Sequence, residues 1–178
     1  MKTKEEIIEL LRTDVQAFNA YRRQLIEQEI YDLDLSFTNL SGANLRNANL
    51  NCANLYYASL SGSNLSGADL GNATLWNADL RNSNLSRVNL SFVDLSCVKL
   101  DQEFIQVTGL GSKKRMTTYL FSDDLIFCGC FKGSLKEFKK RVKKTYPEEE
   151  NKYRLEYLDF IKMINKKRKR LKNDLQKM

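Results

Sequence analysis

Residues 43–55 have the sequence ANLRNANLNCANL, in which a leucine recurs every five residues. The same spacing extends from Leu35 to Leu100 and gives fourteen consecutive leucines without an omission. Two residues before each leucine lies a small or slender residue, most often alanine, and one residue before it lies mostly Asn or Asp. A repeat of fixed short period determines the fold of the segment that carries it, so it is the first feature to interpret.

A period of five residues fits neither a straight α-helix nor a continuous β-strand. On a helix each step of five residues turns the chain by about 500°, so successive leucines drift around the axis by about 140°. On a strand an odd step places alternate leucines on opposite faces. If the chain instead bends once per repeat, every leucine returns to the same side. We therefore predict a solenoid with leucine and alanine inside and with Asn, Ser, Gly and Asp outside, where they suit corners.

This A-(N/D)-L-x-x unit resembles the pentapeptide-repeat family over about residues 30–102. The resemblance implies a mainly β fold, a right-handed quadrilateral β-helix in which four pentapeptides make one coil. The segment is then long enough for about 3.5 coils, stacked at the usual strand spacing of about 4.8 Å.

The sequence predicts three parts: an N-terminal capping helix (1–29), the repeat β-helix (30–102) and a C-terminal α+β module (103–178). The open end of a solenoid exposes apolar edges and unpaired backbone groups, which a cap must cover. Thr3 and Glu6 have the spacing of a capping box. Apolar residues then recur at helical intervals, which predicts one helix over about residues 4–26: Ile7, Leu11, Val15, Phe18 and Leu25.

After the repeats, β-prone runs at 104–107, 117–121 and 125–131 predict short strands, and two helices follow. Ser134 and Glu137 form a second capping box, Pro147 ends the helix that it opens, and the last helix covers about 150–175. The stretch GCFKGSLKEF at 129–138, with the later Tyr153 and Tyr157, resembles C-terminal modules of phage and prophage proteins. This resemblance implies a mobile-element origin and no particular activity.

The basic character of the chain, net charge +7, belongs to its C-terminal part. Residues 102–178 carry twenty basic and ten acidic groups, whereas residues 31–101 carry four basic and six acidic groups. The densest run is a candidate for binding polyanions such as phosphate backbones: Lys166, Lys167, Arg168, Lys169, Arg170 and Lys172. The alternative is a solvated terminal helix that frays.

The residues that most enzyme chemistries need are missing. The chain has no histidine, no Walker A loop and no G-x-G-x-x-G motif, so we expect neither catalysis nor a cofactor. Cys52 and Cys97 are predicted to lie too far apart for a disulfide, and Cys128 with Cys130 is too sparse a set for zinc. We expect reduced thiols and no metal.

No apolar run approaches the roughly 20 residues that span a membrane, and no signal peptide opens the sequence. These observations predict a cytoplasmic protein without a membrane partner.

Outward positions 20 residues apart should stack from coil to coil. This register gathers four aromatic residues on one face, which makes them a candidate protein-binding site: Phe37, Tyr56, Tyr57 and Trp76. The alternative is that the C-terminal module covers these rings, or that they stack between coils for stability alone.

We therefore predict a non-catalytic protein–protein interaction scaffold, whose partner the sequence does not identify. One alternative is a nucleic-acid-associated protein that acts through the basic C-terminal tail. Another is a DNA-mimicking modulator of gyrase or topoisomerase, an activity of some pentapeptide-repeat proteins that resemble this repeat. Those mimics are longer and markedly acidic, whereas this repeat has a net charge of only −2. The family resemblance also suggests an end-to-end dimer, although the sequence does not define the oligomeric state.

Overall fold

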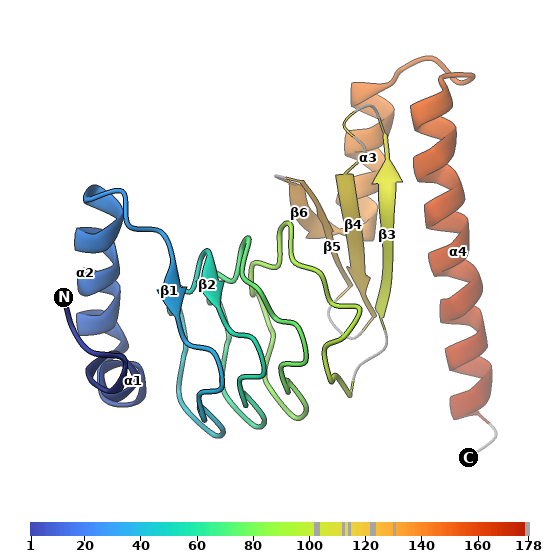
Figure 1. Cartoon of the computed structure of the whole chain (residues 1–178). Coiled ribbons are helices and arrows are strands. Elements are labelled where there is room, and N and C mark those ends of the chain that lie inside the picture. The colour runs from blue at the N-terminus through green and yellow to red at the C-terminus, as the bar shows by residue number, and fades with distance from the viewer. Residues whose placement is uncertain (102–103, 112, 114, 122–123, 130, 177–178) are drawn as a thin grey trace. The chain divides into compact units, whose positions relative to one another are not determined.

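The structure, a computed structural model, describes residues 1–101, 104–111, 113, 115–121, 124–129 and 131–176. The chain forms two compact units, Met1–Asp101 and Gln102–Met178. Helices α1 (Lys4–Thr13) and α2 (Val15–Glu27) precede the repeats in the first unit (Figure 1). The described part of the second unit contains four strands and two helices. The predicted boundary at residues 102 and 103 lies outside the described residues.

The repeat segment bends once in every pentapeptide. From Phe37 to Phe92, the second residue after each leucine has a positive φ, between 54° and 73°. The N–H of the residue that follows then donates to the carbonyl of the leucine, as Ala48 does to Leu45 at 3.0 Å. A positive φ at the third of four turn residues, with this hydrogen bond, is the geometry of a type II turn. The regular turn returns each leucine to the same side of the chain.

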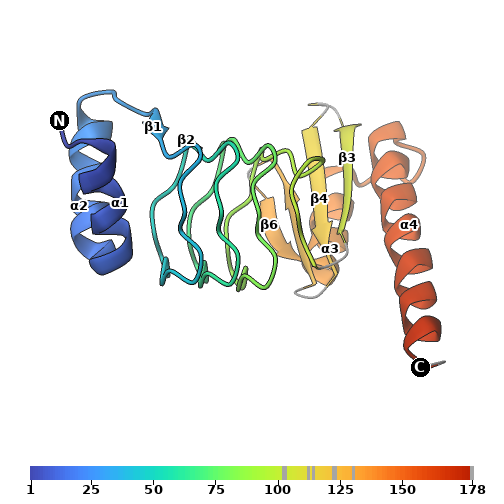
Figure 2. The same ribbon diagram turned by 60° about the horizontal axis from the view of Figure 1, so that its bottom comes forward.

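Successive coils are offset by 20 residues. Strand β1 (Leu33–Asp34) pairs in parallel with β2 (Ala53–Asn54), and isolated bridges continue this register along the segment, as between Asn44 and Asn64. Backbone bonds join the coils, and the N–H of Leu50 donates to the carbonyl of Asp69 at 2.8 Å. Each coil therefore holds four pentapeptides in a β-helix-like arrangement (Figure 2). Extended strands stay short because a turn interrupts the chain every five residues.

Leucine fills the interior of the coils. Thirteen of the fourteen repeat leucines are at most 3% exposed, and Leu100 is half-buried at the end of the segment. Two polar residues, Thr38 and Ser63, occupy the inward position of alanine and are also buried. Their hydroxyls donate to the carbonyls of the preceding leucines, at 2.6 and 2.7 Å. Each buried hydroxyl thus has a partner, as burial requires.

The Asn or Asp before each leucine stabilises the corner of the coil. Its side-chain oxygen accepts a hydrogen bond from the N–H two residues later, at 3.0 Å from Ser86 to Asn84 and at 2.9 Å from Gly71 to Asp69. This local contact is an Asx turn, which Asn and Asp form more readily than other residues. The preference for Asn and Asp at this position therefore has a structural cause.

Two helices, rather than the single predicted helix, precede the repeats: α1 (Lys4–Thr13) and α2 (Val15–Glu27). The backbone leaves the helical region at Asp14, with φ −148° and ψ 88°, and the Asp14 carboxylate accepts from the N–H of Ala17. The prediction of one helix over residues 4–26 is therefore wrong, because Asp14 caps a new helix. The capping box of Thr3 and Glu6 is confirmed.

The two helices cover the first coil. Ile7, Leu11, Phe18 and Leu25 are buried, and Val15 is half-buried. Polar side chains of the helices donate to carbonyls at the edge of this coil: Lys4 to Ser36, Arg12 to Asn39, Asn19 to Asn47 and Arg22 to Asn51. The cap thus binds backbone groups that have no preceding coil to pair with.

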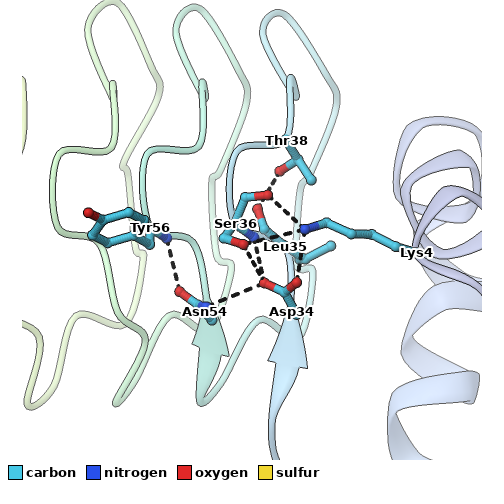
Figure 3. A network of polar contacts seen from close by, with 7 residues as sticks. All are labelled: Lys4, Asp34, Leu35, Ser36, Thr38, Asn54 and Tyr56. Carbon is cyan, nitrogen blue, oxygen red and sulfur yellow. Dashed lines mark hydrogen bonds and ion pairs between the residues drawn. The ribbon is translucent and has the colours of Figure 1, made fainter.

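Asp34 lies where the cap meets the first coil (Figure 3). It accepts from the hydroxyl and the N–H of Ser36, at 2.6 and 3.0 Å, and pairs with Lys4 at 2.9 Å. The hydrogen bonds from Ser36, followed by the contact with Lys4, lower the pKa of Asp34 from 3.8 to about 2. The ionised carboxylate therefore favours the folded state at neutral pH.

Because the folded pKa lies below the unfolded one, this contribution is present above pH 3.8 and is lost as the pH falls towards about 2. We expect the free energy of unfolding to decrease over this range, and we expect Asp34→Asn to make the decrease smaller. Urea denaturation at several pH values measures both slopes. Equal slopes for the variant and the wild type would show that Asp34 does not contribute.

The second unit contains one antiparallel sheet in the order β3-β4-β5-β6. Its strands are β3 (Phe104–Leu110), β4 (Arg115–Leu120), β5 (Leu125–Cys128) and β6 (Phe131–Ser134). The prediction of a single strand over 125–131 is wrong. Gly129 has a φ of 58°, and the chain reverses so that Cys128 pairs with Phe131.

Helices α3 (Leu135–Thr145) and α4 (Lys152–Leu175) pack on one face of this sheet (Figure 1). The predicted capping box of Ser134 and Glu137 opens α3 and is confirmed. The core combines residues of the sheet and of both helices: Tyr119, Ile126, Cys128, Leu135, Phe138, Val142, Tyr157, Phe160, Ile161 and Ile164. Within the described part of the chain, no helix has both the length and the apolar character that crossing a membrane requires.

Candidate functional site

Four rings of the repeat unit form a continuous cluster, here called the aromatic face: Phe37, Tyr56, Tyr57 and Trp76. Phe37 stacks on Tyr57 with ring centroids 5.5 Å apart and planes at 12°, and Tyr56 stacks on Trp76 at 5.3 Å and 13°. Each stacked pair joins two adjacent coils. Edge-to-face contacts at 4.6–5.9 Å join the two stacks. The structure therefore brings together all four residues that the 20-residue register predicts.

The aromatic face is exposed and uncharged. Phe37 is 71% exposed, Tyr57 46% and Trp76 45%, and Tyr56 is half-buried. Desolvation, followed by the neighbouring Tyr57, raises the pKa of Tyr56, so its hydroxyl is neutral at physiological pH. Large aromatic side chains that are exposed together are typical of partner-binding sites.

Two members of the aromatic face have an unusual backbone conformation, which the sequence interpretation missed. Phe37 has a φ of 56° and Tyr57 a φ of 54°. The left-handed region costs a residue with a side chain about 1 kcal/mol or more. Asn or Gly occupies seven of the other ten corners between Phe37 and Phe92, for example Asn47, Gly62 and Asn72. The recurrence of Asn and Gly at the corner position is the sequence signal that predicts a positive φ there.

The stacking alternative for these rings also has direct support, because both parallel pairs bridge adjacent coils. An aromatic pair contributes about 0.5–1.5 kcal/mol beyond the area that it buries. The strained corners at Phe37 and Tyr57 offset a gain of this size. Stability alone therefore gives little reason for aromatic residues at these two corners.

The basic run of α4 divides into two kinds of residue. Arg168 pairs with Asp124 at 2.5 Å and lies 5.3 Å from the ring centroid of Tyr119, so it packs against the sheet. Burial, followed by the hydrogen bond to Asp124, raises the pKa of Tyr119 to about 12. Lys167 is half-buried, whereas the other members of the predicted set are exposed: Lys166, Lys169, Arg170 and Lys172.

Metal-binding residues do not gather in the described part of the chain, where no group of three His, Cys, Asp or Glu side chains lies close enough to hold an ion. Cys52, Cys97 and Cys128 are free thiols. Cys130, the other cysteine of the C-x-C pair that is too sparse for zinc, lies outside the described residues.

Similar solved structures include three pentapeptide-repeat proteins. One, from the cyanobacterium Cyanothece 51142, is 41% identical and aligns over 38% of this chain and 47% of its own, with a TM-score of 0.37. HetL from the cyanobacterium Nostoc, involved in heterocyst differentiation regulation, is 30% identical over 38% of this chain and 39% of its own, with a TM-score of 0.23. An Arabidopsis thaliana protein of the thylakoid lumen is 33% identical over 37% of this chain and 52% of its own, with a TM-score of 0.20.

The chain thus spans about half, or less, of the length of these relatives. No curated protein matches it. The family model for pentapeptide repeats matches residues 31–67 and 63–102. Proteins with this repeat are generally non-catalytic. The matched residues are those that bend every five positions and pair every 20. Residues 31–102 of the chain are therefore similar to the pentapeptide-repeat family.

Proposed function

We propose that this protein is a non-catalytic, cytoplasmic scaffold that binds another protein through the aromatic face. The observation that carries the proposal is the exposed and continuous contact of four rings across adjacent coils. We also propose that the coil is right-handed and square in cross-section, as the family resemblance implies. The free thiols of Cys52, Cys97 and Cys128, the cysteines in the described part of the chain, are consistent with a reducing compartment.

The aromatic face has the features of a preformed binding site. Large aromatic side chains contribute disproportionately to binding energy at protein interfaces. Here their backbone is held by a turn in every pentapeptide, and their rings are held by one another. Binding by such a rigid surface costs little conformational entropy. The left-handed corners at Phe37 and Tyr57 also suggest that these side chains are retained for a reason other than stability.

The double variant Phe37→Asn/Tyr57→Asn tests this proposal. Asn already occupies the same corner at positions 47, 72 and 77, with a positive φ, so the variant should fold. The free energy lost with one ring stack should nearly equal the free energy gained by relieving two strained corners. We therefore expect a melting temperature within about 5 °C of the wild type. The double variant should no longer capture the protein that crosslinks to the immobilised wild-type chain in a lysate of the source organism.

Phe92→Asn is the matched control. Phe92 is 47% exposed and has a φ of 63° at the same corner of its pentapeptide, but it has no ring contact with the four residues of the aromatic face. This variant should retain the crosslinked protein. If the double variant also retains it, the aromatic face is not the binding site. If the double variant loses it only because the fold melts, the rings serve stability.

Exposed cations on α4 support a second candidate function, nucleic-acid association through the basic tail. Lys169 and Arg170 are exposed, and such side chains bind phosphate backbones with an affinity that falls as salt concentration rises. Lys169→Glu/Arg170→Glu should then abolish duplex DNA binding. The gyrase-mimic, phage-origin and dimer hypotheses stay predictions that no contact in the described residues favours.

A further inference from the structure

The second unit contains a pocket of about 530 Å3 between its sheet and its helices. Its lining residues come from the segment after β3, from β5 and β6, from α3 and the residue after it, and from α4: Lys113, Cys128, Phe131, Lys132, Phe138, Arg141, Val142, Thr145, Tyr146 and Tyr157. Small-molecule sites in proteins commonly have volumes of about 300–1,000 Å3. The pocket is therefore large enough for an organic ligand and larger than a single inorganic anion needs.

The charge of the pocket is of one sign. Lys113 and Arg141 are exposed cations of its lining, and none of the described lining residues is acidic. Lys132 also lines the pocket, but its ammonium lies over the ring of Phe127, its cross-strand partner. Helix α3, which contributes Arg141, carries six basic residues and one acidic residue. Low-dielectric walls and like charges concentrate a positive potential in a cleft. The pocket therefore favours an anionic ligand.

Aromatic rings form the second feature of the lining. Tyr146 and Tyr157 are nearly parallel, with centroids 6.2 Å apart and planes at 27°, and Phe138 meets Tyr157 edge-on at 5.5 Å. Phe131 lies 5.3 Å from Phe138. Tyr146 and Phe131 are only half-buried, so their rings are accessible to a planar group. Bases stack on such side chains in many nucleic-acid and nucleotide sites.

We propose that this pocket binds a phosphorylated nucleoside. Arg141 and Lys113 bind the phosphate, and the base packs against Tyr146 and Phe131. A lone phosphate would leave the aromatic lining without a role, and a neutral planar ligand would leave Lys113 and Arg141 without one. Arginine suits phosphate because its planar fork donates two hydrogen bonds at once. This proposal is independent of the aromatic face, which belongs to the other unit.

Isothermal titration calorimetry of the full chain with adenosine monophosphate, adenosine and inorganic phosphate tests the proposal. The monophosphate should bind at one saturable site, and adenosine and phosphate should each bind at least about tenfold more weakly, which corresponds to about 1.4 kcal/mol. The affinity should fall as salt concentration rises. The absence of saturable binding below about 1 mM, or equal binding of phosphate and nucleotide, would overturn the proposal.

Two variants locate the site. Arg141→Ala, at an exposed position, should weaken nucleotide binding by about tenfold, the usual effect of removing a charge-assisted hydrogen bond. Lys136→Ala removes a charge from the same helix at a residue outside the pocket lining and should leave the affinity unchanged. Tyr146→Phe keeps the ring and should bind like the wild type, whereas Tyr146→Ala should lose the preference for nucleotide over phosphate. Equal effects of the two charge variants would place the ligand elsewhere.

The phosphorylated nucleoside can be a free nucleotide or the end of a nucleic-acid strand. A short single-stranded oligonucleotide with a terminal phosphate distinguishes these sources. If the ligand is the end of a strand, the oligonucleotide should bind the wild-type chain and adenosine monophosphate should displace it. If the ligand is a free nucleotide, adenosine monophosphate should bind and the oligonucleotide should not. An oligonucleotide that binds but is not displaced would be held by the exposed lysines of α4, and this result would overturn the proposal.

Discussion

Leu70→Asp should unfold the repeat unit. Leu70 is fully buried in the leucine interior, and its N–H donates to the carbonyl of Asn89 in the next coil. Truncation of a buried leucine costs about 2–5 kcal/mol. An unpaired carboxylate in the same place adds several kcal/mol, unless it is protonated. Together these costs approach the total stability of a typical domain, about 5–15 kcal/mol. Far-UV circular dichroism with thermal and urea denaturation measures the loss.

Ser86→Asp is the matched control for this prediction. Ser86 is exposed and directly follows Leu85, so the same charge enters the repeat one position after an inward residue. We expect its free energy of unfolding to stay within about 0.5 kcal/mol of the wild type. Similar losses for the two variants would contradict the inward and outward register of the pentapeptide.

Gly111→Ala should strongly destabilise the second unit. Gly111 has a φ of 71°, and a methyl group there would meet the ring and the hydroxyl of Tyr157, which is 7% exposed in the core. The left-handed backbone costs about 1 kcal/mol for alanine, and overpacking of a filled core costs about 1–3 kcal/mol more. The expected loss is therefore about 2–4 kcal/mol in urea denaturation.

Gly109→Ala separates the two causes. Gly109 also has a positive φ, 83°, but a methyl group there would meet no atom within 4 Å. This variant should lose only the backbone contribution, about 1 kcal/mol. If both variants lose the same free energy, the contact between Gly111 and Tyr157 does not contribute.

The sequence predicts the structure of the repeats better than that of the segments on either side, because the same pattern of residue types recurs in each pentapeptide. Leucine, the Asn or Asp before it and the corner residue after it each have one structural role. Because many pentapeptides carry the same pattern, one atypical residue does not change the predicted structure. The helix before the repeats lacks this redundancy. Its apolar spacing continues through Asp14, yet the local cap formed by that one carboxylate ends the first helix. Likewise, the single Gly129 divides one apolar run into β5 and β6.

The aromatic face could be predicted because a strict 20-residue register places distant residues in one column. The second unit has no such register. Arg168 and Asp124 are 44 residues apart, and nothing in their spacing indicates the ion pair between them. The pocket was missed for the same reason, since Arg141, Tyr146 and Tyr157 come together only when α3 and α4 pack on the sheet. In this unit, tertiary packing rather than sequence period determines which residues meet.

Residue-resolved amide hydrogen exchange tests the pentapeptide geometry most directly. The N–H groups of Leu40 and Leu60 donate to the carbonyls of Ser59 and Asp79 in the next coil, at 2.7 and 2.8 Å, and should exchange slowly. The N–H that follows each leucine, such as that of Ser41, donates only to a nearby side chain at 3.0 Å and should exchange faster. We predict a minimum of protection at every fifth residue between 56 and 71, where a coil lies on each side. Minima at another spacing in this range, or Leu60, Leu65 and Leu70 amides that exchange as in an unfolded chain, would contradict a bend in every pentapeptide.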